Sequence, residues 1–390
     1  MFLDLLVKHN PALIDYGIYL LEQGLIEPDT YVLDLDSIEK NAHRLQDISK
    51  KFKLTLYFMS KQLGRNPEVS RRVLAAGFTG MVAVDFREAM ILHSAGIPVK
   101  HLGHLCQIPN KFLDAALDMN CDVISIYSFE KAQDLSKAAQ RRGIVQDLLL
   151  RVRDYGDIFY QGQEGGFPLE TLHQSLDSIK KLPNIRIMGL TTFPCFLYQA
   201  DKRMALPTPN AYTLVKGAIM LKEHGIPCLQ INMPSCNSPA TMPLAAELGA
   251  THLEPGHSLT GTNPDNLDED EPLSPALLYM SEVSHHVENR SFCFGGGYYR
   301  RSNLYNALVK TSRGLEKSKV ISPQLDAIDY HLELSGLFPS GSAVCMAFRT
   351  QIFVTRSRVA LVDGLTHNRP KLLGIWDSQG QALSKGMSNG

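Results

Sequence analysis

The stretch Leu54-Thr55-Leu56-Tyr57-Phe58-Met59-Ser60-Lys61-Gln62-Leu63-Gly64-Arg65-Asn66-Pro67 contains the pattern that decides the fold. Its first residues form a short apolar run, rich in aromatics, that is typical of a buried β-strand. Asn66 is suited to cap a helix that begins at Pro67. Lys61 stands between strand and helix, at the carboxyl end of the strand, where α/β barrels keep their reactive groups. Because a partly desolvated lysine can attack an aldehyde, Lys61 is a candidate Schiff-base residue. On this stretch alone, a surface-loop lysine is the more ordinary interpretation.

Strand-like and helix-like segments alternate around this stretch. Strands are expected at Tyr31–Asp36, Thr55–Ser60, Met81–Asp85, His101–Leu105, Val123–Tyr127, Leu148–Val152, Ile185–Thr192, Cys228–Met233 and Thr251–Glu254. Helices are expected at Pro67–Ala76, Arg87–Ala95, Lys111–Met119, Phe129–Arg142, Leu169–Lys181 and Tyr212–His224. This repetition predicts the α/β class and, over such a length, a (β/α)8 TIM-type barrel. An open, doubly wound sheet is the alternative, because periodicity does not distinguish the two.

The rest of the chain predicts three further regions. Residues 11–24 have the pattern of an amphipathic helix that pads the barrel, and the acidic, proline-flanked run 262–272 has that of a solvated linker. Strand patterns follow at Leu277–Val287, Ser291–Phe294, Ala343–Val354 and Arg358–Val362, before a polar tail, 379–390, that is expected to fray. We therefore predict a helical segment at 1–28, a barrel at 29–262 and a β-rich C-terminal domain at 263–390.

Composition excludes several classes of protein. The formal net charge of -1 provides no field that would attract nucleic acid or an anionic membrane, so neither is expected as a partner. Seven cysteines without regular spacing argue for reduced thiols. Neither a signal peptide nor a stretch of transmembrane length is recognised. These features predict a cytoplasmic protein.

Two further stretches give the chain a family resemblance. They are Tyr31-Val32-Leu33-Asp34-Leu35-Asp36-Ser37-Ile38-Glu39-Lys40-Asn41 and Leu253-Glu254-Pro255-Gly256-His257-Ser258-Leu259-Thr260-Gly261. Together with the lysine stretch they resemble the alanine racemase family of fold-type III pyridoxal-phosphate enzymes, and Met59–Pro67 is similar to its YhfX-like branch. The resemblance favours the barrel over the open sheet. It also implies pyridoxal 5'-phosphate held on Lys61, and a homodimer with sites at the subunit interface.

The resemblance also implies how the phosphate of the cofactor is held. Hydroxyls and backbone N–H groups bind phosphate well, because they supply fixed dipoles. Ser238 is predicted to cap a helix that begins at Pro239. Two turns are involved, one at Ser235–Ser238 and one at Gly256–His257. Without the resemblance, both would be read as ordinary turns. The implied phosphate ligands are Ser235, Ser238, Gly256 and His257, with Arg65 as a possible counter-ion.

Glu254 and Phe193 depart from the racemase pattern. Racemases carry an arginine at the position of Glu254, whereas the related ornithine and diaminopimelate decarboxylases carry this glutamate. A carboxylate there favours the protonated pyridine nitrogen and a stronger electron sink. Phe193 lies about where racemases use a histidine, and it could stack on the cofactor ring or serve as a core aromatic. Both departures imply that the cofactor ring would act as an electron sink of the kind found in a decarboxylase, eliminase or aldolase, and less like that of a racemase.

Four other residues are candidates for the site. Arg151 lies in a strand from which it could point inward to the cofactor or outward. His104 is aimed at the barrel mouth or is simply a structural histidine. Near the glycine-rich run 295–297, Cys293 and Tyr298 are candidate acid–base residues, because the tyrosine that racemases use there is replaced by Phe294. A tight turn is the ordinary interpretation of that run. No metal site is predicted.

These features predict a pyridoxal-phosphate enzyme that acts on an amino acid through an external aldimine. Family resemblance makes a racemase or epimerase the first choice. The alternatives are a decarboxylase and a D-amino-acid eliminase or aldolase. Two further alternatives are a non-catalytic cofactor carrier, against which the C-terminal domain argues, and a cofactor-free barrel that binds a phosphorylated substrate.

Overall fold

The computed structural model describes residues 2–268, 272–324 and 326–385. Contacts divide the chain into two compact units, each made of separate segments. The barrel unit comprises His43–Ser60 and Val73–Gly256, and the sheet unit comprises Met1–Ala42, Lys61–Arg72 and His257–Gly390. The predicted domain ranges, 1–28, 29–262 and 263–390, are contiguous, and they stay a prediction.

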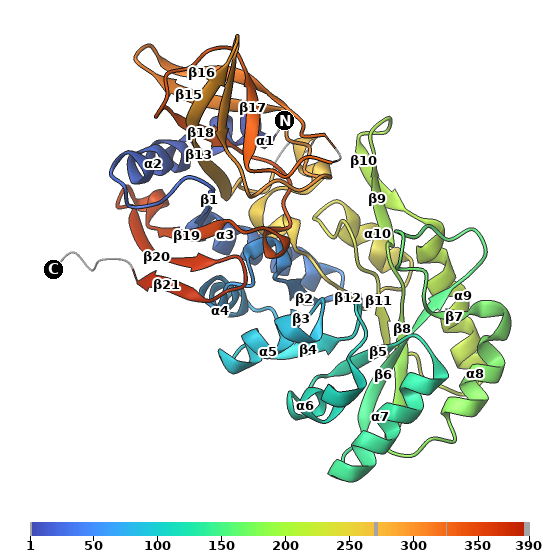
Figure 1. The fold of residues 1–390 in the computed structure, drawn as a ribbon. Helices are drawn as coiled ribbons and strands as arrows, with labels where there is room; N and C mark the ends of the chain where they lie inside the picture. Colours follow the sequence, from blue (N-terminus) through green and yellow to red (C-terminus); the bar gives the residue numbers. More distant parts are fainter. Residues whose placement is uncertain (1, 269–271, 325, 386–390) are drawn as a thin grey trace. The chain divides into compact units, whose positions relative to one another are not determined.

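Eight parallel strands close the barrel unit (Figure 1). Their order is β5-β4-β3-β2-β12-β11-β8-β6, and β6 pairs back to β5. This closure confirms the predicted barrel and excludes the open sheet. The strands are β2 (Thr55–Met59), β3 (Gly80–Val82), β4 (Val99–Leu102), β5 (Val123–Ile126), β6 (Gln146–Arg153), β8 (Ile185–Thr191), β11 (Gln230–Asn232) and β12 (His252–Leu253). The short β7 (Phe167–Pro168) extends β6, and β9 (Phe196–Gln199) and β10 (Met204–Pro207) form a separate hairpin.

The helices follow the strands as the sequence predicts. They are α3 (Leu35–Lys51), α4 (Pro67–Ala75), α5 (Phe86–Ser94), α6 (Leu113–Asp118), α7 (Phe129–Arg142), α8 (Leu172–Ile179), α9 (Pro209–Glu223) and α10 (Thr241–Glu247). Local chemistry sets their limits: the Ser128 side chain caps α7, which ends at Gly143 in the left-handed region at φ 64°. Asn66 Oδ1 likewise accepts the backbone N–H of Glu68 at 2.9 Å and caps α4 as predicted.

The sheet unit holds a sheet of ten strands, ordered β14-β17-β16-β15-β18-β13-β1-β19-β20-β21. Because β14 also pairs with β13, the strands from β14 to β13 close into an antiparallel barrel. The strands are β1 (Thr30–Asp34), β13 (Leu277–Val287), β14 (Arg290–Phe294), β15 (Asn306–Thr311), β16 (Gly314–Ile321), β17 (His331–Ser335), β18 (Ala343–Met346), β19 (Arg358–Asp363), β20 (Lys371–Asp377) and β21 (Ala382–Lys385). This architecture confirms the predicted β-rich C-terminal domain.

The first strand lies in this sheet and not in the parallel barrel. The sequence predicts it as a barrel strand at Tyr31–Asp36, but it pairs antiparallel with β13 and parallel with β19. All five residues of β1 are buried, and a short apolar run does not indicate which sheet will bury it. The prediction of a strand is therefore right, and its place is wrong.

The N-terminal helices α1 (Phe2–His9) and α2 (Pro11–Glu22) pack on the sheet unit. Their apolar side chains join Val32, Leu278 and Met280 in one buried cluster. Helix α2 therefore covers the antiparallel sheet and does not pad the parallel barrel as predicted. Among the described residues, no helix is long and apolar enough to cross a membrane.

Two predictions for polar segments are wrong where the structure describes them. The expected solvated linker is buried at Asn263, Asp265 and Asn266, and the Asn266 amide donates to the carbonyl oxygens of Gly261 and Leu273. Part of the expected frayed tail forms β21, which pairs with β20. Residues 269–271 and 386–390 lie outside the described residues. Both errors arise because a polar composition does not reveal whether the polar groups of a segment will form hydrogen bonds within the protein.

Candidate functional site

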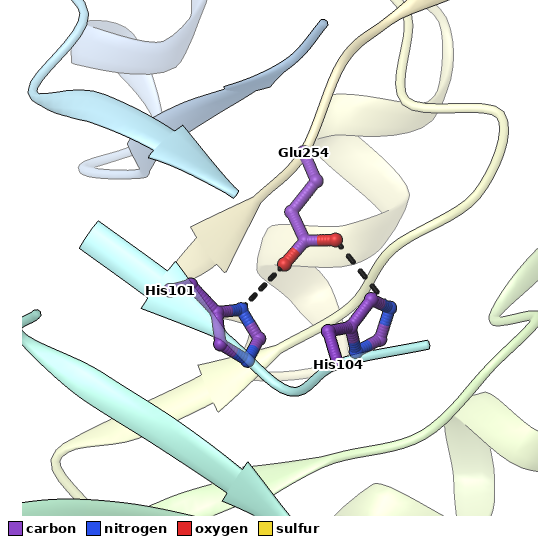
Figure 2. A group of neighbouring side chains, drawn as sticks. All are labelled: His101, His104 and Glu254. Carbon is purple, nitrogen blue, oxygen red and sulfur yellow. Dashed lines mark hydrogen bonds and ion pairs between the residues drawn. The ribbon is translucent and has the colours of Figure 1, made fainter. Parts of the chain in front are cut away.

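Glu254 follows β12 in the barrel unit, and its side chain is held on one oxygen. His101 Nδ1–H and an Asn232 Nδ2–H each donate to Glu254 Oε1 at 2.8 Å. Asn237 Oδ1 accepts the backbone N–H of Glu254 at 2.8 Å. Glu254 Oε2 accepts no hydrogen bond from the described residues, and His104 Nε2 lies 3.5 Å from it (Figure 2). The arrangement fixes the carboxylate, and Oε2 can accept a hydrogen bond from a bound ligand.

Glu254 is ionised in this environment although its side chain is buried. Burial raises the pKa of Glu254, but the charge of His104, the hydrogen bond and charge of His101 and the hydrogen bond from Asn232 outweigh it and lower the pKa to about 2. The carboxylate therefore carries a full negative charge across the physiological pH range. A donor that binds Oε2 would be stabilised in its protonated form.

His101, His104 and Glu254 also form a group with the geometry to hold a metal ion. Their candidate ligand atoms lie within 4.8 Å of one another, and no other such trio occurs among the residues that the structure describes. The two ring nitrogens of His101 are already engaged, Nδ1 with Glu254 and Nε2 with Ser125 Oγ at 2.6 Å. Because a metal ion would have to displace one of these hydrogen bonds, we interpret the group as a carboxylate–imidazole network.

Arg151 and Phe193 lie beside this network, as the sequence predicts. Arg151 is fully buried, and its Nη1 donates to the His104 carbonyl oxygen at 3.4 Å and to Tyr127 Oη at 2.7 Å, contacts that favour the inward alternative. The Phe193 ring lies edge-on to the His104 ring, with centroids 6.0 Å apart. The Arg151 Nε–H is buried and has no hydrogen-bond acceptor among the described residues. The barrel unit thus brings together four of the predicted residues, Glu254, His104, Arg151 and Phe193.

The loop after β11 carries the two predicted phosphate-binding serines. Ser235, at φ 86°, donates its hydroxyl to the Phe196 carbonyl oxygen at 2.8 Å. Helix α10 begins at Thr241 and not at Pro239 as predicted, although Ser238 Oγ accepts the Thr241 N–H at 3.4 Å and Thr241 Oγ1 accepts the Ser238 N–H at 2.9 Å. The loop is tied to Glu254 through Asn237. Phosphate binding by Ser235, Ser238 and Gly256 stays a prediction.

In the sheet unit, Lys61 begins the short helix η1 (Lys61–Leu63) and acts electrostatically on His257. His257 Nε2–H donates to the Thr350 carbonyl oxygen at 3.0 Å, and Gln62 Nε2 lies 3.4 Å from Nδ1. Burial and the positive charges of Arg349, Lys61 and Arg301 lower the pKa of His257 well below its usual value. The ring is therefore neutral and engaged on both nitrogens, so it does not supply the charge that the predicted phosphate contact would use.

Arg65 has partners of its own within the sheet unit. Its Nη1 donates to Gln379 Oε1 at 2.8 Å, and its guanidinium lies 4.9 Å from the centre of the Phe353 ring. These contacts attach the segment after Lys61 to the C-terminal strands. The predicted role of Arg65 as a phosphate counter-ion stays a prediction.

The environment of Cys293 does not favour a thiolate, and its predicted catalytic role stays a prediction. Cys293 is fully buried in β14, and its thiol donates to the Leu332 carbonyl oxygen at 3.6 Å. Burial raises the pKa of the thiol to about 12, so a thiolate is not available at neutral pH. Tyr298 is half-buried, its backbone N–H donates to Asp329 Oδ2 at 3.2 Å, and its acid–base role stays a prediction.

Close packing explains the glycine-rich run beside these residues. A side chain at Gly296 would collide with the Asp29 carboxylate, and one at Gly297 would collide with the Tyr279 ring. Tyr31 Oη–H donates to the Gly297 carbonyl oxygen. The glycines therefore allow a loop to lie against β1 and β13, and they do not form a phosphate cradle.

We expect Cys293→Ala to leave turnover unchanged within about twofold and to lower the free energy of unfolding by about 1 kcal/mol, because only a small buried side chain is removed. Steady-state kinetics and urea unfolding measure the two effects. A loss of turnover above tenfold in a folded variant would restore the catalytic role of this cysteine.

Sequence reasoning misses His101 and Asn232, the two donors to Glu254. His101 lies within β4 and Asn232 ends β11. The available signal was a polar side chain in a short buried strand, which is costly unless it has a partner. The partner could not be identified, because His101 and Glu254 are 153 residues apart in sequence.

The fold defines a class of proteins, parallel barrels with a β-rich C-terminal domain. The chain belongs to the alanine racemase family: the family described as "Alanine racemase, N-terminal domain" matches residues 33–264, and "YhfX-like, C-terminal domain" matches residues 278–372. A relative from Escherichia coli (strain K12), called "Uncharacterized protein YhfX", is 44% identical over 98% of this chain and 100% of its own length.

Two solved structures have a similar fold at low identity. D-threonine aldolase from Filomicrobium marinum is 15% identical, with a TM-score of 0.69 over 91% of this chain and 96% of its own. Alanine racemase from Clostridium difficile 630, in complex with cycloserine, is 15% identical, with a TM-score of 0.63 over 89% of this chain and 98% of its own. At this identity the likeness concerns the fold alone.

Proposed function

We propose that this protein is a pyridoxal-phosphate enzyme that acts on an amino acid, and that its reaction is a lyase reaction. The observation that carries the proposal is the buried, ionised Glu254, held by His101 and Asn232 on Oε1 while Oε2 accepts no hydrogen bond among the described residues. Such an oxygen suits the N–H of a protonated pyridine ring. Membership of the alanine racemase family supports the choice of cofactor.

The family resemblance suggests how the residues of this chain would share the binding of the cofactor. Lys61 would hold its aldehyde covalently, Glu254 would bind its ring nitrogen, and Arg151 and Phe193 would bound the ring. The loop with Ser235 and Ser238 and the turn at Gly256 would bind its phosphate. When bound, pyridoxal phosphate supplies an electron sink for negative charge at the Cα of the amino acid. The homodimer expected from the resemblance is part of the same proposal.

The protein supplies two functions besides binding. Glu254 holds a proton on the ring nitrogen, because its charge favours the protonated form of any donor at Oε2. The Lys61 amine, once the amino group of the substrate has replaced it, is available to move a proton at Cα. The burial of Glu254, His101 and Arg151 keeps water away from the charged network, which strengthens these interactions.

The acid–base residues favour a lyase over a racemase. A racemase needs a proton donor or acceptor on both faces of Cα, whereas decarboxylation, elimination and retro-aldol cleavage can proceed with one. The raised pKa of the buried Cys293 thiol argues against it as the second group, and Phe294 carries no proton to transfer. Racemisation is the second candidate, and Tyr298 is the residue that favours it, because its phenol could act on the other face.

A panel of D- and L-amino acids distinguishes the candidates. With the cofactor-loaded protein, we expect release of CO₂, a keto acid or an aldehyde from at least one amino acid, and a change of chirality at a rate at least tenfold lower. Chiral chromatography, gas release and carbonyl assays measure these products. Chirality change alone would establish the racemase, and no turnover with any amino acid would favour the cofactor carrier.

A further inference from the structure

Arg349, a residue without a predicted role, lies three residues after the end of β18. The residues from Ala343 to Phe348 are all buried, whereas Arg349 is half-buried. Its backbone N–H donates to the Ser302 carbonyl oxygen at 2.9 Å, which fixes the main chain at this point. An arginine here is unexpected unless its guanidinium has a function, because partial burial of a cation is unfavourable.

The guanidinium of Arg349 lacks the partners that its neighbours have. Its Nε–H is buried and has no acceptor, and no ion pair of Arg349 occurs among the residues that the structure describes. By contrast, Arg65 in the same unit donates to Gln379, and Arg356 pairs with Asp329 at 3.2 Å. Buried donors in folded proteins almost always have acceptors, so an arginine in this state indicates a ligand that supplies one.

The surroundings of Arg349 are positively charged. The next residue, Thr350, accepts the His257 Nε2–H at 3.0 Å, which places the start of this segment beside the turn that follows Gly256. Arg349, Lys61 and Arg301 act together on the His257 ring, and all three favour its neutral form. Because His257 is neutral, it adds no charge of its own, and the three cations supply the attraction for an anion.

We propose that Arg349 binds an oxyanion beside His257, and that the oxyanion is either the phosphate of the cofactor or the carboxylate of the amino-acid substrate. The planar, forked guanidinium matches both groups, which accept two parallel N–H bonds. The identity of the anion rests on the proposed function, whereas the presence of an anion site does not.

The first experiment tests the site without the cofactor. Thermal unfolding of the full-length protein is followed while inorganic phosphate or acetate is added, for the wild type, Arg349→Gln, Arg349→Lys and the matched control Arg313→Gln. Arg313 pairs with Glu316 on an exposed hairpin and has no contact with His257. We expect at least tenfold weaker anion stabilisation in Arg349→Gln, partial retention in Arg349→Lys and a wild-type response in the control.

The second experiment identifies the source of the anion. If Arg349 binds the cofactor phosphate, Arg349→Gln weakens binding of pyridoxal phosphate at least tenfold and leaves pyridoxal binding unchanged. If it binds the substrate carboxylate, cofactor binding is unchanged, and binding of amino acids weakens while binding of the corresponding amines does not. Titration by visible absorbance measures each affinity.

Two outcomes separate the two proposals. If Arg349→Gln matches Arg313→Gln in every titration, the anion site is refuted and the proposed function stands. If the wild type binds neither pyridoxal phosphate nor pyridoxal, the proposed function fails, and the inorganic phosphate and acetate titrations still decide whether Arg349 binds an anion. Without anions, Arg349→Gln should unfold at or above the wild-type temperature, because it loses only an unpaired charge, so weaker binding would not reflect misfolding.

Discussion

Lys61→Ala is expected to lose the visible absorbance band of the lysine-bound cofactor and to lower turnover by about a thousandfold or more. The variant lacks both the amine that holds the aldehyde and the group available to move the Cα proton. Absorbance spectra of the purified variant with added cofactor and single-turnover kinetics measure the two effects.

Lys61→Arg is the matched variant, because it keeps the positive charge near His257 but does not form a Schiff base under these conditions. We expect it to unfold at nearly the wild-type temperature and to lack the absorbance band. Borohydride reduction followed by peptide mapping gives an independent readout, in which the cofactor should be attached to Lys61. Attachment to another lysine, or a band that persists in Lys61→Ala, would contradict the assignment.

Glu254→Gln is expected to lower turnover by about 100- to 1,000-fold, a typical cost of removing a preorganised charge in a buried site. The substitution keeps the shape of the side chain but removes the charge that favours a protonated ring nitrogen. His101 Nδ1–H would still find an oxygen acceptor, so the cost in stability should be about 1–3 kcal/mol, the cost of imperfectly satisfied buried donors. Kinetics and urea unfolding measure these changes separately.

The matched control is Glu223→Gln at the exposed end of α9, which makes the same change of charge in the barrel unit. It should leave both turnover and stability near wild type. The absorbance band of bound cofactor should survive in Glu254→Gln, because Lys61 is intact. Turnover within threefold of wild type in Glu254→Gln would contradict the proposed role of Glu254 in keeping the ring nitrogen of the cofactor protonated.

The sequence predicts the barrel well because each of its strands is marked locally. The apolar run around Tyr57 and the cap at Asn66 are short-range signals, and they appear in the structure where predicted. Signals of this kind do not state which sheet a strand joins. That choice depends on partners distant in sequence, which is why β1 was assigned to the wrong sheet.

The site was predictable where the resemblance covers it and not elsewhere. Glu254, His104 and Phe193 come together as expected. The sequence does not reveal His101 because its partner is remote in sequence, and it does not reveal that Cys293 is buried because exposure cannot be inferred from a residue type. Electrostatics also depends on the fold: burial and three cations together hold the pKa of His257 well below its usual value.

The position of β1 has a consequence for synthesis on the ribosome. This strand lies between β13 and β19, whose residues are translated only after the whole parallel barrel has emerged. Until then the apolar faces of α1 and α2 have no sheet to cover them. The nascent chain therefore has to keep its first residues from aggregating for most of its elongation, and folding of this unit is governed by contacts of very high sequence separation.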